Sequence, residues 1–325
     1  MSARLKTLAR FAMSAALVAG VLVALDAGAA LKKLSSADPL WLFVTALLLS
    51  AQTWAMALRW RLVAARLGVQ IGAVRAVTEY YLAQAVNMTL PGGVLGDVTR
   101  AARSRESAGL GPAALAVALE RLAGQIAMGT ILGLGFLLAL VLPGGMAWPR
   151  PMATGISAGV LVALLAGVAL HHMALRKPGT RAARFAAALS RALFAPDIRG
   201  RQIALGLLVA GLNLAAFAAA ARATGTTLPP EAWVTLIPLV LTAMVIPLSI
   251  GGWGWREGAA AALFPIAGAS AEAGVAAALA FGLVLLGISL PGALVPLLAR
   301  RRLPAPDPPL SSKTEKLSRC QETPP

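Results

Sequence analysis

The chain has 325 residues, of which 58% are hydrophobic and only 13% are charged, and its mean hydropathy is +0.76. A soluble domain carries roughly a quarter charged residues, so this composition excludes a water-soluble globular protein. The formal net charge of +16 does not indicate nucleic-acid binding, because the basic residues lie between apolar runs, as the positive-inside rule describes. We therefore expect an all-α polytopic membrane protein, a helical bundle of about 6–8 transmembrane segments.

Six continuous apolar runs predict membrane-spanning helices, since a span needs about 20 apolar residues. The runs lie at about Leu8–Ala27, Pro39–Leu58, Ala114–Leu142, Ala153–Met173, Ile203–Ala221 and Gly274–Leu298. Three basic residues, Arg4, Lys6 and Arg10, lie before or at the start of the first run, and Ala-Gly-Ala at positions 27–29 ends it, which resembles a signal peptide. We interpret it as a retained anchor, because it is long for a signal peptide and a second span follows almost at once.

Two further apolar stretches are interrupted by proline and glycine. Ala76–Leu95 contains Pro91-Gly92-Gly93, and Ala232–Ala267 contains Pro247 and Gly251-Gly252-Trp253-Gly254. Such breaks predict half-helices that meet at membrane depth, which requires that the free backbone faces protein or a watery cavity. The alternative interpretation is two ordinary spanning helices kinked at proline.

The distribution of basic residues predicts an orientation. Segments 59–75 and 176–201 and the run Arg300-Arg301-Arg302 are rich in arginine and lysine, and we expect all three in the cytoplasm. They fall on one side if the first broken stretch is a hairpin open to the cytoplasm and the second is open to the outside. Both termini are then cytoplasmic, and only Lys32-Lys33 violates the rule. Hairpins of opposite orientation are typical of inverted-repeat transporters.

The last residues differ in composition from the rest. Residues 303–325 are rich in proline, serine and charge and are predicted to be a disordered cytoplasmic tail, which leaves residues 1–302 as the membrane domain. The single cysteine, Cys320, lies in this tail, so no internal disulfide is expected. The sequence has no nucleotide, zinc or redox motif, so we expect no metal and no cofactor.

Polar residues gather around the first break. Tyr80, Gln84 and Asn87 are spaced i, i+4 and i+7, so a helix places them in one stripe. Gly96-Asp97 and then Arg100 follow the break. A broken helix exposes free N–H groups and a positive dipole end, which suit an anion such as a phosphate. The alternative is that the arginines simply lie at the cytoplasmic interface.

Two charged pairs lie within apolar segments, where ionisable groups are costly and usually mark function or a buried partner. Glu120-Arg121 opens a span, and Asp97 and Arg100 are candidate partners for it; a structural role and a substrate-binding role are equally compatible with the sequence. Arg256-Glu257 follows the second break. Arg256 suits a lipid phosphate, and Glu257 could balance that charge or take up a proton; the alternative is a salt-bridged helix start with interfacial tryptophans.

These strings occur in the order of a known family. They are Leu58-Arg59-Trp60-Arg61, Asn87 with Leu90-Pro91-Gly92-Gly93, Gly96-Asp97-Val98-Thr99-Arg100, Glu120-Arg121, and the segment Ile246–Glu257. Together they resemble the transmembrane, flippase-like region of lysylphosphatidylglycerol synthases and its stand-alone relatives, over about residues 10–300. Two positions depart from the pattern: Leu95 stands where the family often has glycine, and Glu120 where aspartate is common.

The resemblance implies a translocase that moves a phospholipid or other polar lipid between the leaflets of the bacterial inner membrane. The soluble synthase domain is not expected, so no enzymatic activity is carried over. The alternatives are an intramembrane lipid-modifying enzyme, or a membrane partner in a lipid, hopanoid or glycolipid pathway. The expected ligand is an anionic, aminoacylated or pathway lipid, and a lipid-synthesis enzyme is a candidate protein partner.

The residues and the resemblance together define one set of candidate substrate-binding residues. They are Asn87, Pro91, Gly92, Gly93, Gly96, Asp97, Arg100, Glu120, Arg121, Ser249, Gly251, Gly252, Gly254, Arg256 and Glu257. In this hypothesis Arg100, Arg121 and Arg256 meet the lipid phosphate, and the glycines shape a cleft between the two broken helices.

Overall fold

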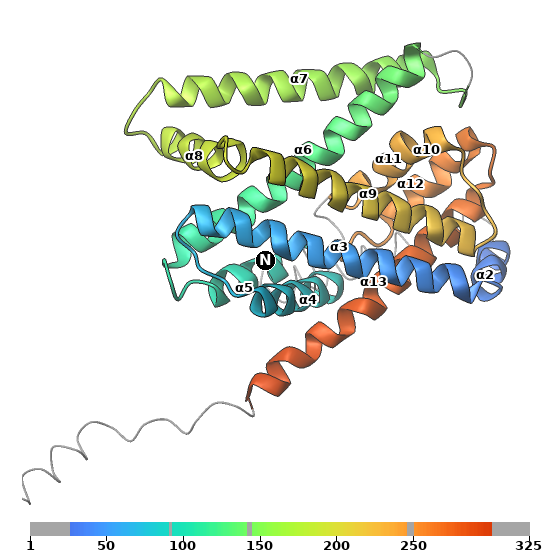
Figure 1. Cartoon of the computed structure of the whole chain (residues 1–325). Helices are drawn as coiled ribbons and strands as arrows, with labels where there is room; N and C mark the ends of the chain where they lie inside the picture. Colours follow the sequence, from blue (N-terminus) through green and yellow to red (C-terminus); the bar gives the residue numbers. More distant parts are fainter. Residues whose placement is uncertain (1–26, 91–92, 142–144, 246–249, 301–325) are drawn as a thin grey trace, which may run out of the picture. The chain divides into compact units, whose positions relative to one another are not determined.

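The computed structural model describes residues 27–90, 93–141, 145–245 and 250–300, with side chains as far as residue 292 (Figure 1). Every regular element in these ranges is a helix, as the composition predicted. Residues 8–26 of the first predicted span, the candidate residues Pro91, Gly92 and Ser249, and the predicted tail lie outside the described residues.

Five helices are long and apolar enough to cross a membrane. They are α3 (Pro39–Arg66), α6 (Leu110–Val141), α7 (Arg150–Leu175), α9 (Arg199–Ala223) and α13 (Ala271–Arg300). These helices coincide with the five predicted runs that fall in the described ranges. The chain is therefore a multi-pass helical membrane protein. Helix α3 extends beyond Leu58 because Trp60 and Val63, in its last two turns, are completely buried against neighbouring helices.

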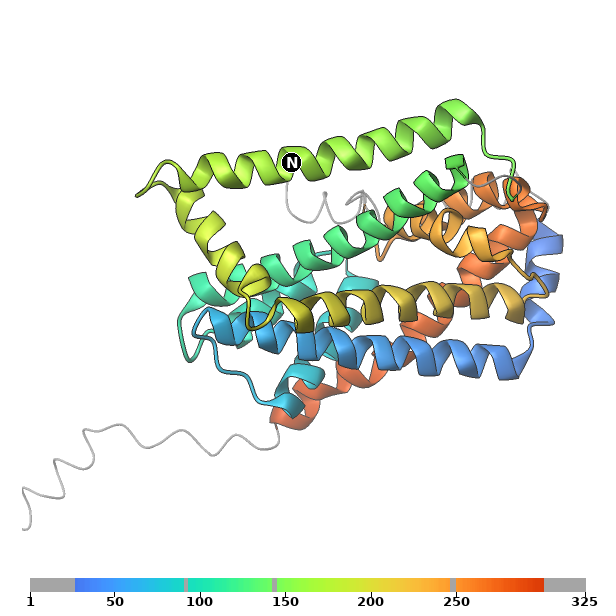
Figure 2. The same ribbon diagram turned by 45° about the horizontal axis from the view of Figure 1, so that its top comes forward.

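Helices α3 and α9 lie side by side along most of their length in both views (Figures 1 and 2). They run in opposite directions. At one end the Asp38 backbone N–H, just before α3, donates to the Ala223 carbonyl at the end of α9, at 2.8 Å. At the other end Arg66, the last residue of α3, forms an ion pair with Asp197, just before α9. This antiparallel pair fixes the directions of the segments that follow each helix.

The first broken stretch is an antiparallel helical hairpin, named hairpin 1 here, made of α4 (Ala73–Thr89) and α5 (Leu95–Arg103). Near its tip the Gly96 N–H donates to Asn87 Oδ1 at 2.7 Å. Near its base Arg103 pairs with Glu79, and Arg75 pairs with Glu106 just after α5. A Cβ on Gly96 would overlap the backbone of Ala83, so the two arms meet at a glycine. The second arm is amphipathic and extends past the end of the apolar stretch.

The second broken stretch, named hairpin 2 here, consists of α10 (Pro230–Val234), α11 (Leu236–Ala243), α12 (Trp255–Leu263) and a 3-10 turn (Phe264–Ala267). Helices α11 and α12 contact each other. Its base lies at the end where α9 finishes, because α10 begins soon after Ala223 and contacts α9; there Glu231 accepts from the Met146 N–H that follows α6. Three glycines with positive φ, Gly251, Gly252 and Gly254, form the turn before α12.

The two hairpins approach each other from opposite ends of the α3–α9 pair. A Cβ on Gly251 of hairpin 2 would lie 3.1 Å from Met88 Sδ at the tip of hairpin 1. The chain order is the same in both halves: a long helix (α3 or α9), a hairpin, and a second long helix (α6 or α13). Because α3 and α9 are antiparallel, the two halves form an inverted repeat. Helix α7, α8 (Arg181–Leu189) and a π-helical turn (Ser190–Phe194) connect them.

Each hairpin has its own apolar core. One core surrounds Trp60 and joins hairpin 1 to α3, the start of α6 and α8. The other surrounds Phe217 and joins hairpin 2 to α9, α13 and the second half of α6. Along α3 and α6 a polar layer separates the two cores. Helix α13 touches both hairpins through glycine, since a Cβ on Gly274 would overlap Ala260 and one on Gly292 would overlap Tyr81.

Candidate functional site

A cavity of about 340 Å³ lies in the polar layer between the two cores. Four helices line it with residues spaced i, i+4 and i+7, so each helix turns one face toward it. These faces are Gln52, Met56 and Arg59 on α3, Tyr80, Gln84 and Asn87 on α4, Arg121, Gln125 and Met128 on α6, and Gly206, Ala210 and Asn213 on α9. Hairpin 2 closes the cavity with the end of α11, through Thr242 and Met244.

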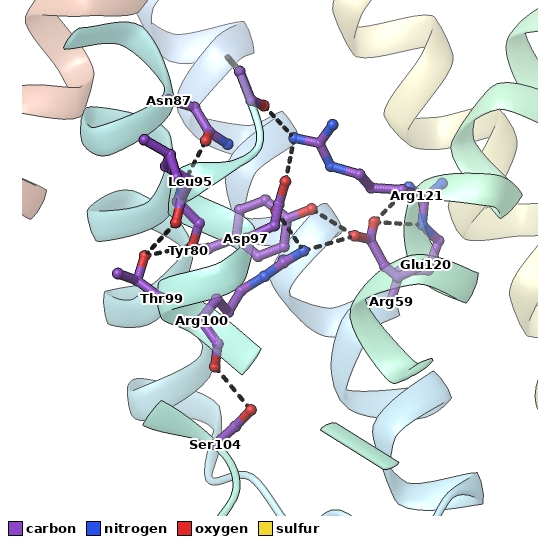
Figure 3. A network of polar contacts seen from close by, with 12 residues as sticks. Arg59, Tyr80, Asn87, Leu95, Asp97, Thr99, Arg100, Ser104, Glu120 and Arg121 are labelled. Carbon is purple, nitrogen blue, oxygen red and sulfur yellow. Dashed lines mark hydrogen bonds and ion pairs between the residues drawn. The ribbon is translucent and has the colours of Figure 1, made fainter. Parts of the chain in front are cut away.

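A buried carboxylate, Glu120, organises the charges at the cavity wall (Figure 3). Its Oε1 accepts from Arg59 Nη2 at 2.6 Å, and its Oε2 accepts from the Tyr80 hydroxyl at 2.9 Å and from Arg100 Nη2 at 3.3 Å. The side chains of Arg59, Arg100 and Glu120 are at most 3% exposed. Three elements, α3, hairpin 1 and α6, are thus tied together by one side chain.

Asp97 extends this network towards the opening of the cavity. Its Oδ1 accepts from Arg100 Nη2 at 3.1 Å, and its Oδ2 forms an ion pair with Arg121, in a geometry that is not that of a hydrogen bond. Arg121 Nη2 also donates to the Gly93 carbonyl at the tip of hairpin 1, at 3.0 Å. Asp97 is 13% exposed and Arg121 is 46% exposed, so Arg121 is the most accessible charged member of the network.

Arg100 is held between two aromatic rings. Its Cζ lies 4.2 Å from the centroid of Tyr80 and 4.6 Å from that of Trp60. A guanidinium within about 6 Å of an aromatic face is stabilised by the ring quadrupole, which accounts for a charge that is almost completely buried. Arg100 itself does not line the cavity; it braces the two carboxylates, which do.

The predicted residues of hairpin 2 form a separate and closed group. Arg256 donates to Glu257 Oε1, and Glu257 Oε2 accepts from the Gly254 N–H at 2.7 Å. The Arg256 guanidinium lies over the ring of Trp253 and near that of Phe281. Both charged residues are at most 1% exposed, and neither lines the cavity. The structure thus shows the salt-bridged helix start that the sequence offered as an alternative.

The structure brings together Asn87, Gly93, Gly96, Asp97, Arg100, Glu120 and Arg121. It adds two residues that were not in the predicted set, Arg59 and Tyr80. The basic segment 59–75 predicts a cytoplasmic position for Arg59, although the nearby Ala57 and Trp60 are apolar and buried. Gln52 and Asn213 also line the cavity without having been predicted; each is a single amide in an apolar run, and an isolated polar residue inside a span is the signal that could have indicated them.

Comparison with known proteins identifies the family of the chain. A family model described as the lysylphosphatidylglycerol synthase TM region matches residues 8–292. The chain belongs to this family. No curated protein and no solved structure matches it.

Membership in the lysylphosphatidylglycerol synthase TM-region family confirms the resemblance seen in the sequence and places the protein in a membrane-lipid context. The match covers both halves of the inverted repeat and therefore both hairpins. All residues of the cavity lie within the matched range.

Proposed function

We propose that the protein translocates a polar lipid between the leaflets of the bacterial inner membrane without changing it chemically. One observation carries this proposal: the tips of two oppositely oriented hairpins meet beside a cavity that contains a buried arginine–carboxylate network. Inverted repeats that meet at a central site are the usual architecture of alternating-access transporters. The lipid headgroup would occupy the cavity while the acyl chains stay in the bilayer.

The proposed orientation follows from charge. The end of the α3–α9 pair that carries Arg66 also carries the base of hairpin 1, with Arg75 and Arg103. Because arginine and lysine concentrate on the cytoplasmic side, we assign this end to the cytoplasm. Hairpin 1 then opens to the cytoplasm and hairpin 2 to the outside, with both termini cytoplasmic.

The test is a leaflet-exchange assay with purified protein in liposomes. A lipid with a fluorescent headgroup or chain is quenched from outside by dithionite, and the loss of the protected inner pool reports translocation. We expect Arg121→Gln to slow exchange at least about tenfold, because it removes the most accessible cation of the network. Arg184→Gln, an exposed arginine on α8 outside the cavity, serves as the matched control and should behave as wild type.

Two results would contradict the proposal. One is exchange that equals protein-free liposomes for every phospholipid headgroup tried. The other is the appearance of a chemically altered lipid on thin-layer or mass analysis, which would favour a lipid-modifying enzyme. Equal activity of Arg121→Gln and wild type would place the headgroup site elsewhere.

A further inference from the structure

The charges and free hydrogen-bonding groups that line the cavity indicate the chemical class of its ligand. We infer that it selects a lipid headgroup made of one phosphodiester anion and neutral hydroxyl groups, such as a glycerol or sugar phosphate, and that it rejects a cationic aminoacyl headgroup. This inference rests on the proposed function and deepens it by naming the chemical class of the substrate.

The first argument is the charge of the site. The network contains three arginines, Arg59, Arg100 and Arg121, and two carboxylates, Asp97 and Glu120. One positive charge is therefore left over at a largely buried site, where an unpaired charge is costly. A ligand with a single negative charge would neutralise it. A phosphodiester carries one negative charge at neutral pH, whereas an aminoacylated phosphatidylglycerol with a basic side chain is cationic overall.

The second argument is that both carboxylates of the site are already paired with arginines. Both oxygens of Glu120 accept from Arg59, Tyr80 or Arg100, and both oxygens of Asp97 face an arginine. In contrast, a donor is left over: Arg59 Nη1 is buried and has no hydrogen-bond partner among the described residues, and Arg59 is part of the cavity wall. The site thus offers an unpaired arginine donor to an anion, whereas an ammonium group would have to compete with arginines for Asp97 and Glu120.

The third argument is the set of amides around the charged wall. Gln52, Gln84, Asn87, Gln125 and Asn213 all line the cavity. Gln84 and Asn87 each use their oxygen within the protein, to accept from Thr53 and from the Gly96 N–H, which leaves their NH2 groups available. The other three amides make no hydrogen bond within the described part of the chain. A carboxamide both donates and accepts, as a hydroxyl does, whereas an ammonium only donates.

The experiment compares short-chain lipids that bind as monomers to the full-length protein in detergent or nanodiscs, by calorimetry. The probes are dihexanoyl phosphatidylglycerol, its lysyl ester, and dihexanoyl phosphatidylethanol, which keeps the anion and lacks the hydroxyls. Free glycerol 3-phosphate tests whether the acyl chains are needed. We expect phosphatidylglycerol to bind at least about tenfold more tightly than the lysyl ester, because like charges in a desolvated site repel. We also expect it to bind several-fold more tightly than phosphatidylethanol.

A variant tests whether the amides cause the tighter binding of the lipid that carries hydroxyl groups. Asn213→Leu should reduce the preference for phosphatidylglycerol over phosphatidylethanol towards unity, while Gln70→Leu, an exposed amide outside this cavity, should keep it. The inference is overturned if the lysyl ester binds as tightly as phosphatidylglycerol or more tightly. It is also overturned if phosphatidylethanol, or glycerol 3-phosphate alone, binds the wild type as tightly as phosphatidylglycerol does. Translocation of the lysyl ester in the leaflet-exchange assay would sink only this inference. Absence of exchange for all lipids would sink the proposed function as well.

Discussion

Hairpin 1 and hairpin 2 occupy corresponding places in an inverted repeat, yet they use their charges differently. In hairpin 1, Asp97 and Arg100 reach out to Glu120 and Arg121 on the long helix that follows. In hairpin 2, Arg256 pairs with its own neighbour Glu257, and the following long helix supplies Phe281 and Gly282. The difference teaches that the fold fixes where a charge lies, whereas the facing helix decides whether that charge is available to a ligand.

The largest expected effect is on thermal stability, and it compares Glu120, which pairs with two arginines, with Glu257, which pairs with one. Glu120→Ala would remove the carboxylate that pairs with Arg59 and one of the two that pair with Arg100, whereas Glu257→Ala would remove the partner of Arg256 alone. Breaking a buried ion pair costs about 3–5 kcal/mol, so both variants should lower the thermal unfolding temperature in detergent, and Glu120→Ala should lower it more. Glu106→Ala, an exposed carboxylate at the base of hairpin 1, is the control. Equal losses for the two buried residues would show that the network is not shared.

The next effect probes how tightly each hairpin is packed. A Cβ on Gly96 would overlap the backbone of Ala83, whereas a Cβ on Gly282 would overlap the side chains of Arg256 and Trp253. Overpacking costs about 1–3 kcal/mol, and backbone yields less readily than the end of a side chain. We therefore expect Gly96→Ala to lower the unfolding temperature more than Gly282→Ala. Gly287→Ala meets nothing within 4 Å and should match the wild type. The reverse order would mean that hairpin 2 is the more rigid one.

The smallest effect lies at the base of hairpin 1 and depends on pH. Arg75 holds the pKa of the exposed Glu106 carboxyl below its ordinary value. A carboxyl whose pKa is lower in the folded state stabilises the fold at pH values above its unfolded pKa, about 4.3, and this contribution is lost as the pH falls through the folded pKa. We expect the unfolding temperature of wild type to fall slightly more than that of Glu106→Gln between pH 7 and about pH 3. Parallel curves for the two proteins would argue against this contact in solution.

Much of the fold could be predicted from the sequence because the bilayer constrains it so strongly. Apolar runs of sufficient length gave the long helices, and Pro91-Gly92-Gly93 and Gly251-Gly252 marked the two hairpins. The helix ends could not be predicted from hydropathy, since α3 continues past Leu58 to bury Arg59 and Trp60. Burial of an arginine depends on a partner 61 residues away, Glu120, and no local pattern reports such a pairing.

The candidate site was predictable only in part, for the same reason. The stripe of Tyr80, Gln84 and Asn87 follows from helical spacing alone, and these three residues do line the cavity. The separation of Arg256 from the cavity does not follow from spacing, because it depends on Trp253 and Phe281 covering the guanidinium. A glycine-rich string followed by charge therefore indicates a hairpin turn. It does not tell whether the charged residues reach the cavity or are buried under neighbouring side chains.

The antiparallel contact of α3 with α9 has a consequence for motion. The pair is fastened at both ends, by the Asp38 N–H on the Ala223 carbonyl and by Arg66 on Asp197. A slide of one helix along the other by a single turn, about 5.4 Å, would break both fastenings at once. A small rotation about the long axis of the pair would keep them. The contact is therefore expected to resist sliding of α3 along α9 and to permit a small rotation of the pair.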